Sequence, residues 1–500
     1  MDAATTAPVK AAASGNAAAS VAESPWEQRR QEVVAMLGKC WAAYRRDAFG
    51  ADVYRPLSHS GQWFGPDRRG IGFTIADSLD TLLLAGLRTE YEQGRDWIAR
   101  SLSFDVDANV SVFETTIRVL GGLLGGYTLT RDAILLDRAR ELGDRLLAAY
   151  ATPSGVPYPM VNLATGKGSY YNGRAEVSLA EVGTLQLEMR ELSRLTNEPK
   201  YWQAAKRADD VVARMRTLDG LLPAVFPSPS AGASSLGYTM GAMADSYYEY
   251  LLKRWLQTGR AESSLRQRYD HAVLGMRKHL VKTSAHSHYV FSGDLEDDGA
   301  FTPRMQHLTC FIGATLALGA LNDAGNPARA SDDMRLAADI TDTCVDMYAN
   351  MPTGLSPELV YMQESSARQV RASNATTTTT AAPNSDMSTV DGATYNILRP
   401  ETLESLFLMW RATGDAKYRE RAWRIFEAFK KHALTPDGSC FTSIADVTKV
   451  PVAQMDLMES FLIAETFKYF ILIFDDNPST LPLDRYVLNT EAHPLPIFKA

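Results

Sequence analysis

The sequence predicts an all-α protein, and within that class a closed α/α barrel of seven helical hairpins. Two observations support this prediction. Along the chain, apolar helical segments alternate with amphipathic ones, and the joints between them recur at a regular spacing. From Thr130 to Thr196 is 66 residues, and from Thr196 to Thr258 is 62. A period in this range is typical of repeated helical hairpins.

The predicted helices, taken in order, form six complete pairs and two single helices. The first segment, 28–49, has a helical period with charges on its other face, and the last, 458–474, has no partner after it. The six pairs between them are 73–87 with 90–102, 110–126 with 132–149, 179–195 with 199–215, 238–256 with 262–281, 307–321 with 332–351, and 400–411 with 416–431. If the first and last helices pack on each other, they complete a seventh pair.

The first helix of each pair is apolar on nearly all sides, as in the run from Phe407 to Trp410. A helix that is apolar all round is buried, so these helices should form an inner ring that the amphipathic helices surround. This distinguishes a closed barrel from an open solenoid of the same hairpins. Strand signals are weak and predict only short hairpins in loops, at 156–159, 167–171 and 287–293.

Two segments are predicted to lie outside the barrel. Residues 1–27, rich in Ala, Ser and Thr, read as a disordered lead-in, and residues 28–500 as a single catalytic domain. Residues 372–391 begin with a low-complexity stretch that contains five consecutive threonines, and we expect a surface loop there. This insertion accounts for the longer spacing before the joint at Thr413.

Charge and composition exclude several classes of function. The net charge is −8 and the chain has no basic cluster, which argues against nucleic acid or an anionic membrane as partner. No apolar run approaches the ~20 residues of a membrane span, and the first residues lack the apolar centre of a signal peptide. We therefore expect either a cytosolic protein or one whose targeting segment is absent from this chain. The four cysteines lack CxxC spacing, so a zinc site is not expected and a disulfide stays open.

The candidate site follows from how the inner helices begin. Pro400 suits the first turn of a helix, Glu401 and Glu404 share one face of that turn, and Arg399 lies just outside it. Similar polar groups recur at the starts of the other inner helices, which meet at one rim: Asp77, Asp80, Glu114, Arg118, Glu181, Asp245, His307, Glu459 and Glu465.

Any one of these residues is explained by a helix cap or an ion pair. The whole set is not, because carboxylates buried together at one end of an apolar tube repel each other. Facing carboxylates with little histidine and no cysteine favour glycoside hydrolysis, in which one acid protonates the leaving group and one base activates water.

Seven motifs, in order, carry a resemblance to a known family. They are Phe113-Glu114-Thr-Thr-Ile-Arg118, Leu179-Ala-Glu181-Val-Gly-Thr, Ala244-Asp245-Ser-Tyr-Tyr-Glu, His307-Leu-Thr-Cys310-Phe, Leu398-Arg-Pro-Glu-Thr-Leu-Glu404, Glu459-Ser-Phe461 and Asn489-Thr490-Glu491-Ala-His-Pro. From about Trp41 to Pro496 the chain resembles the class I α-mannosidases, glycoside hydrolase family 47. The family's fold is an (α/α)7 barrel, in agreement with the pairs counted above.

The resemblance implies an inverting exo-hydrolase that removes α-1,2-linked mannose from high-mannose N-glycans with a bound calcium ion. It implies Glu114 as the acid, Glu401 as the base, and Asp245 as a third carboxylate at the scissile bond. Inversion needs ~6.5–9.5 Å between the working carboxyl groups, which leaves room for water. The positions that match the family's substrate pocket are Arg118, Glu181, His307, Arg399, Glu404, Phe461, Glu465 and Glu491.

The resemblance also implies a metal ligand and a disulfide. Thr490 matches the calcium ligand, on a segment that would end the chain as a plug inside the barrel. Cys310 and Cys344 match the family's disulfide pair, which favours the secretory-pathway lumen (Golgi or endoplasmic reticulum) or secretion, with the targeting segment absent from this chain. Asn109 and Asn374 begin N-glycosylation sequons, which support the same compartment weakly. We expect a monomer.

Two positions depart from the family pattern. Members of the endoplasmic-reticulum type carry Arg where this chain has Met243, and the loss of that cation predicts broader trimming, as in the Golgi-type and microbial members. The family usually has Asp where this chain has Gln306, for which we expect weaker sugar contact with the chemistry retained.

Two other readings remain open. A weakly active or lectin-like relative that selects misfolded glycoproteins for degradation would share the barrel, although the intact Glu114, Asp245, Glu401 and Thr490 argue against it. An α-solenoid scaffold would show the same hairpins but would need neither calcium nor a rim of carboxylates.

Overall fold

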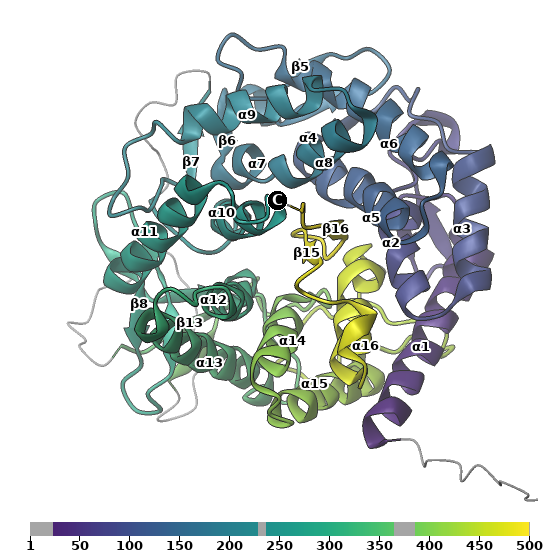
Figure 1. Ribbon diagram of the computed structural model, residues 1–500. Helices are drawn as coiled ribbons and strands as arrows, with labels where there is room; N and C mark the ends of the chain where they lie inside the picture. The colour runs from purple at the N-terminus through teal and green to yellow at the C-terminus, as the bar shows by residue number, and fades with distance from the viewer. Residues whose placement is uncertain (1–23, 229–236, 365–385, 500) are drawn as a thin grey trace, which may run out of the picture.

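A computed structural model describes residues 24–228, 237–364 and 386–499. Its main helices are α1 (Pro25–Ala48), α2 (Phe73–Leu84), α3 (Arg88–Arg100), α4 (Val112–Glu114), α5 (Gly121–Thr130), α6 (Ala133–Leu146), α7 (Leu179–Gly183), α8 (Gln186–Thr196), α9 (Lys200–Val212), α10 (Asp245–Gln257), α11 (Ser263–His279), α12 (Phe311–Leu321), α13 (Pro327–Ala349), α14 (Glu401–Thr413), α15 (Lys417–Ala428) and α16 (Lys468–Phe474). Figure 1 shows them as two concentric rings, with α3, α6, α9, α11, α13 and α15 outside α2, α5, α8, α10, α12 and α14.

The ring closes where the two ends of the helical chain meet. Helix α1 lies beside α16 in Figure 1, and the two pack against each other. This contact supplies the seventh hairpin, and the fold is the (α/α)7 barrel that the sequence predicts. The inner helices are buried on all sides: every residue of α12 is buried except Leu321 at its end.

Several helix boundaries differ from the prediction for local reasons. Helix α10 begins at Asp245 and not at 238, because the preceding turn holds Met243 at a positive φ of 79° that a helix cannot contain. Helix α13 begins at Pro327, five residues before the predicted start, where the side chain of Asn326 caps the first turn. Asp332, the predicted start, lies in the interior of α13.

The first helix also begins earlier than predicted. The side chain of Ser24 accepts a hydrogen bond from the N–H of Glu27, and Pro25 occupies the first turn. Residues 25–27, assigned to the disordered lead-in, are therefore helical. The rest of that lead-in, 1–23, lies outside the described residues. So do 372–385 of the predicted surface loop, with Asn374, whereas 386–391 contain the strand Met387–Thr389.

Strands are short and sit in the loops. They are β1 (Val53–Arg55), β2 (Ser60–Gln62), β3 (Asn109–Ser111), β4 (Met160–Asn162), β5 (Gly168–Ser169), β6 (Glu176–Ser178), β7 (Val225–Pro227), β8 (Val281–Thr283), β9 (Val290–Ser292), β10 (Asp294–Leu295), β11 (Phe301–Thr302), β12 (Arg304–Gln306), β13 (Leu359–Met362), β14 (Met387–Thr389), β15 (Tyr486–Leu488) and β16 (Pro494–Pro496). The predicted strands at 167–171 and 287–293 are present as β5 and β9. The one predicted at 156–159 is wrong, since the strand there is β4.

The last two strands form the predicted C-terminal plug. Strands β15 and β16 pair in antiparallel register, Tyr486 opposite Pro496 and Leu488 opposite Pro494, with Asn489–His493 as the loop between them. Figure 1 shows this hairpin in yellow inside the ring of inner helices. The loop therefore points into the barrel.

Two disulfides cross-link the helices. Cys310, just before α12, bonds to Cys344 on α13, the pair that the family resemblance implies. Cys40 on α1 bonds to Cys440, in the segment after α15. The second bond joins α1, one helix of the hairpin that closes the ring, to the segment between α15 and α16, across 400 residues of sequence. Within the described residues, no helix combines the length and apolar composition that a membrane crossing requires.

Candidate active site

A cavity of about 340 Å³ opens where the inner helices begin, and the plug lines part of its wall. Eight carboxylates and two guanidinium groups line it, together with Phe461 and Thr490. The charged groups are Glu114, Glu181, Asp245, Glu249, Glu401, Glu404, Glu465, Glu491, Arg118 and Arg399. Every residue to which the family resemblance gives a catalytic, substrate or calcium role lines this cavity except His307, which lies directly behind it.

Glu401 begins α14 and is held in its charged form. Burial raises the pKa of a carboxyl group, but the His307 hydrogen bond and the charges of His307 and Arg399 outweigh that effect and lower the pKa of Glu401. The Nδ1–H of His307 donates to Glu401 Oε2 at 2.7 Å, and Tyr348 Oη lies 2.8 Å from Nε2 on the other side of the ring. His307 therefore orients Glu401 from behind.

Asp245, the first residue of α10, has the opposite electrostatics. Burial, with the charges of Glu249 and Glu401, raises the pKa of Asp245 to about 7, against the hydrogen bond from the N–H of Ser246. The cavity thus holds two carboxyl groups of opposite tendency, one ionised and one ready to keep a proton. Such a pair is what an acid–base reaction requires.

Glu114 belongs to a chain of ion pairs. Arg118 Nε donates to Glu114 Oε2 at 2.7 Å, and its Nη1 donates to Glu491 Oε1 of the plug at 2.6 Å. The two residues sit at the junction of α4 with a π-helical segment, Thr115–Leu120. A second π-helical segment, Leu462–Phe467, carries Glu465. Insertions of this kind re-aim the side chains of an inner helix at a functional site.

Phe461 forms an apolar part of the cavity wall between the two arginines. The guanidinium carbons of Arg118 and Arg399 lie 5.3 Å and 5.8 Å from the centre of its ring. Arg399 is held in place by Glu358, whose two carboxylate oxygens accept from its Nε at 2.9 Å and 2.8 Å. An aromatic ring flanked by fixed cations suits a sugar, which offers a C–H face and hydroxyl oxygens.

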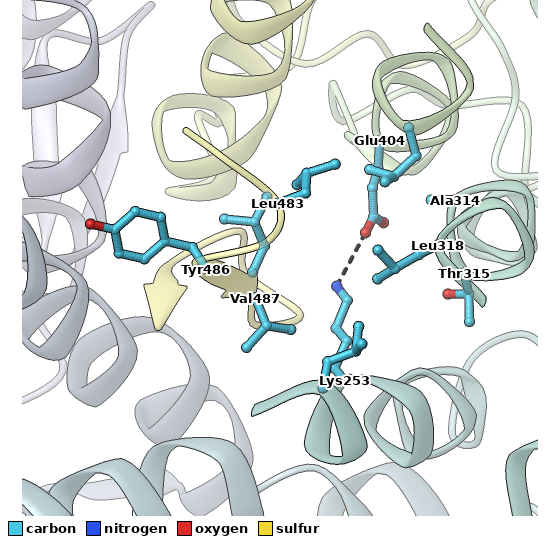
Figure 2. Close-up of a pocket in the computed structure, with 11 residues that line it drawn as sticks. Lys253, Ala314, Thr315, Leu318, Glu404, Leu483, Tyr486 and Val487 are labelled. Carbon is cyan, nitrogen blue, oxygen red and sulfur yellow. Dashed lines mark hydrogen bonds and ion pairs between the residues drawn. The ribbon is translucent and has the colours of Figure 1, made fainter. Parts of the chain in front are cut away.

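Thr490 enters the cavity from the plug. Its hydroxyl donates to Glu249 Oε2 at 2.7 Å, and Glu249 also accepts from the buried ammonium of Lys253. Lys253 in turn lies 3.3 Å from Glu404, as Figure 2 shows, between α10, α14 and the plug residues Leu483 to Val487. Although burial lowers the pKa of a lysine, the charges of Glu249 and Glu404 raise that of Lys253, so it stays charged.

Lys253 does not neutralise the rest of the cavity. Burial raises the pKa of Glu404 to about 7, and the charge of Glu249 adds to that effect. Burial and then the neighbouring carboxylates also raise the pKa values of Glu465 and Glu491 well above the ordinary range. The cavity floor therefore carries more carboxylate groups than cationic ones, which favours the binding of a proton or a cation.

A buried network fixes the plug beneath the cavity. The two ring nitrogens of His493 lie 3.0 Å from Asp77 and 2.9 Å from Asp80, and Lys468 lies 3.0 Å from Asp80. All four side chains are fully buried. Asp77 and Asp80, which the sequence places at the rim, thus serve the plug and not the cavity wall.

The sequence reasoning missed three charged residues of this site. Glu249 and Lys253 follow Asp245 at intervals of four residues, so one face of α10 carries all three, and that spacing was the available signal. Glu358 lies in a loop before β13, where no periodicity marks it. Glu459, predicted at the rim, does not line the cavity.

The two departures from the family pattern lie together. Met243 lines the cavity with half of its surface exposed, and its turn is held by Gln306, whose side-chain oxygen accepts from the N–H of Ala242 at 3.0 Å. Gln306 therefore supports the turn that precedes Asp245.

Comparisons with known proteins agree with this geometry. A model of glycosyl hydrolase family 47 matches residues 36–497. The chain belongs to glycosyl hydrolase family 47. The solved α-1,2-mannosidase of Trichoderma reesei, 28% identical, superposes with a TM-score of 0.84 and covers 95% of this chain and 100% of its own.

Two curated relatives are equally similar to this chain. The human endoplasmic reticulum mannosyl-oligosaccharide 1,2-alpha-mannosidase is 40% identical over 474 residues, which is 94% of this chain and 64% of that protein. The mannosyl-oligosaccharide alpha-1,2-mannosidase IA of Drosophila melanogaster is 40% identical over 479 residues, 94% of this chain and 68% of its own. Overall identity therefore does not separate the endoplasmic-reticulum type from the others. The chain spans less than two thirds of the human relative.

Proposed function

We propose that this family 47 chain is an inverting exo-α-1,2-mannosidase that trims high-mannose N-glycans of glycoproteins. The carboxylate-lined cavity carries the proposal, because it joins an ionised carboxyl group, one whose pKa is raised to about 7 and an aromatic sugar platform in one space. The plug occupies the interior of the barrel behind the cavity, so a sugar enters from one side and a chain end fits better than a chain interior. The names of the relatives support the same linkage and substrate.

In this mechanism Glu401 is the base that takes a proton from the attacking water. Its lowered pKa keeps it ionised, and the His307 ring fixes its orientation. Glu114 is the acid that protonates the leaving oxygen, and Asp245 is the third carboxyl group at the scissile bond. Because water attacks from the face opposite to the leaving group, the mannose released has the inverted, β configuration.

One observation favours a second candidate for the acid. A group that donates a proton near neutral pH must hold it there, and Asp245 has a pKa raised to about 7 whereas Glu114 is ion-paired with Arg118. Substrates with an activated leaving group need no acid, so they distinguish the two. When Glu114 and Asp245 are substituted in turn, the variant that no longer hydrolyses Man9 but still hydrolyses an aryl α-mannoside has lost the acid.

The remaining cavity residues would bind the terminal mannose. Phe461 would pack against the C–H face of the ring, while Arg118, Arg399, Glu181, Glu404, Glu465 and Glu491 would bind its hydroxyl groups. The uncharged Met243 at the cavity edge supports broad trimming, as in Golgi-type and microbial members, over removal of a single mannose.

A calcium ion fits the donors at the plug. Within the described residues, no three His, Cys, Asp or Glu side chains are grouped to hold a metal, so the ion would not sit in a carboxylate cage. Thr490 supplies a hydroxyl and a carbonyl oxygen, and that carbonyl accepts no hydrogen bond from the described residues. The excess of carboxylate around it favours a cation, with waters and sugar hydroxyls completing the six to eight oxygens that calcium takes. When bound, calcium would orient adjacent hydroxyl groups of the sugar.

The same proposal implies a compartment. Two disulfides and the endoplasmic-reticulum relatives support the secretory-pathway lumen or secretion, where N-glycans are found. Asn109 is exposed on β3 and available for glycosylation. We expect the protein to act as a monomer.

A timed digest of Man9 glycan, with products resolved by linkage, tests the function. The protein should release free mannose from α-1,2 linkages and leave the other linkages intact. Glu401→Gln should lower the rate by at least ~10²–10⁴-fold. Glu459→Gln, a carboxylate at the same rim outside the cavity, should leave it unchanged. Glycan binding without any release of mannose would instead support the lectin-like alternative.

A further inference from the structure

A second pocket, of about 490 Å³, lies beside the catalytic cavity. It is formed by the loop before α2, by the last turn of α3 and by the chain that follows α3. Its lining combines aromatic rings, guanidinium groups and hydroxyl groups, namely Trp63, Trp97, Arg68, Arg69, Ser101 and Ser103. No carboxylate lines it, in contrast to the catalytic cavity.

The loop that carries the arginines is held rigidly by one buried side chain. The carboxylate of Asp52 accepts hydrogen bonds from the N–H groups of Phe64 at 2.8 Å, Ile71 at 2.9 Å and Phe73 at 3.1 Å. Both ends of the loop therefore converge on a single acceptor. Between them, the N–H of Gly65 donates to the carbonyl of Arg69 at 3.0 Å and closes the turn.

The tip of this loop has an unfavourable backbone. Asp67 and Arg68 are consecutive residues with φ values of 55° and 57°, in the left-handed region that residues other than glycine seldom adopt. Strain of this kind persists where the surrounding structure enforces it, and it clusters at binding sites. Here it presents the side chains of Arg68 and Arg69 to the pocket.

The two arginines have no internal partner for their charge. Within residues 24–228, 237–364 and 386–499, neither guanidinium group forms an ion pair or a hydrogen bond. Arg68 instead lies over the ring of Trp63, with 5.3 Å between its guanidinium carbon and the ring centre. Both arginines are exposed, and guanidinium donors without a carboxylate partner can bind two oxygen atoms of an anion such as phosphate at once.

The pocket is close enough to the catalytic cavity for one branched saccharide to reach both. Phe64 follows Trp63 and packs edge-on against Phe73, with 5.2 Å between ring centres. The guanidinium carbon of Arg118, in the cavity wall, lies 5.6 Å from the centre of the Phe73 ring. Two aromatic rings thus separate the cavity wall from the edge of the second pocket.

We propose that this pocket binds a sugar residue that carries a phosphate group. The C–H face of the sugar would stack on the tryptophan rings, and the phosphate oxygens would accept from Arg68 and Arg69. The proposal rests on the proposed function in one respect only: the sugar is taken to be another unit of the glycan that the cavity trims.

The test measures binding directly and needs no turnover. The probe is mannose 6-phosphate, titrated into the full chain while the indole N–H signals of Trp63 and Trp97 are followed by NMR. Those signals are assigned through Trp63→Phe and Trp97→Phe. Mannose 6-phosphate should shift both signals, and binding should weaken at least tenfold in Arg68→Ala/Arg69→Ala. The matched control is Arg88→Ala/Arg100→Ala, which removes two arginines of α3 that do not line the pocket, and this variant should bind as the parent does.

The other outcomes overturn the proposal in identifiable ways. Equal binding of unphosphorylated mannose would mean a neutral sugar subsite, and equal binding of inorganic phosphate an adventitious anion only. Unshifted indole signals would mean that the pocket takes neither ligand. The Arg68→Ala/Arg69→Ala variant should still trim neutral Man9 at the parent rate. A chain that trims Man9 but binds no mannose 6-phosphate therefore refutes the second pocket alone, and one that binds it without trimming refutes the proposed function alone.

Discussion

The Cys40–Cys440 disulfide should be the stronger of the two cross-links in the barrel. A disulfide stabilises a protein mainly by restricting the unfolded chain, and in the chain-entropy model the effect grows with the logarithm of the loop length. The bond closes 400 residues, which gives about 6 kcal/mol, whereas Cys310–Cys344 closes 34 residues and gives about 4 kcal/mol. The loop closed by Cys310–Cys344 lies within the loop closed by Cys40–Cys440. It shortens the longer loop by too few residues to change which disulfide stabilises the protein more.

Paired double substitutions test this ranking. Cys40→Ala/Cys440→Ala and Cys310→Ala/Cys344→Ala each remove two buried sulfur atoms, so the loss of packing is closely matched. Urea denaturation of the oxidised proteins should show a free energy of unfolding lower by about 2 kcal/mol in the first variant than in the second. Hydrogen exchange should also become faster in α1, because the bond fastens that helix to the segment after α15. Equal stabilities, or greater loss in the second variant, would refute the reasoning.

Three further predictions concern the cavity and the plug. In the folded protein the pKa values of Asp245 and Glu404 are raised to about 7, so the stability that their protonated forms contribute is lost as the pH rises through 7. The melting temperature of the chelated protein should therefore fall between pH 5 and 8. A flat or rising curve would contradict this. Glu249→Gln should weaken calcium binding by ~10–100-fold in a titration followed by melting temperature, since it removes the carboxylate that orients Thr490, the proposed calcium ligand. Unchanged affinity would exclude that role. His493→Ala should cost ~3–5 kcal/mol of unfolding free energy, because it removes the partner that two buried carboxylates share. His286, whose ring is half exposed beside Asp386, should tolerate the same change with little loss.

The barrel could be predicted from the sequence because burial leaves a direct mark on composition. An inner helix such as α12 has no polar face, and its partner α13 has one, so their alternation reveals the layers without any tertiary information. Helix starts were less reliable. The turn before Asp245 is rich in apolar residues and looks helical, but Gln306, 64 residues beyond Ala242, holds it in another conformation.

The candidate site was predictable where it depends on helix starts and not where it depends on cross-chain contacts. Glu114, Asp245 and Glu401 each open an inner helix, so a common rim follows from the topology. That His307 lies behind Glu401, or that Lys253 neutralises part of the floor, depends on side-chain directions that the sequence does not encode locally. Cys40 and Cys440 are the two cysteines that remain once Cys310 and Cys344 are paired, and the closure of the ring brings them together.

The configuration of the first mannose released tests the central claim most directly. Proton NMR can follow the anomeric signals while the protein hydrolyses Man9, before mutarotation equilibrates the product. Water activated by Glu401 attacks from the face opposite to the leaving group, so β-mannose should appear first and α-mannose should rise only later. If α-mannose appears first, one carboxylate has acted as a nucleophile, and the assignment of Glu401 as a base in an inverting mannosidase is wrong.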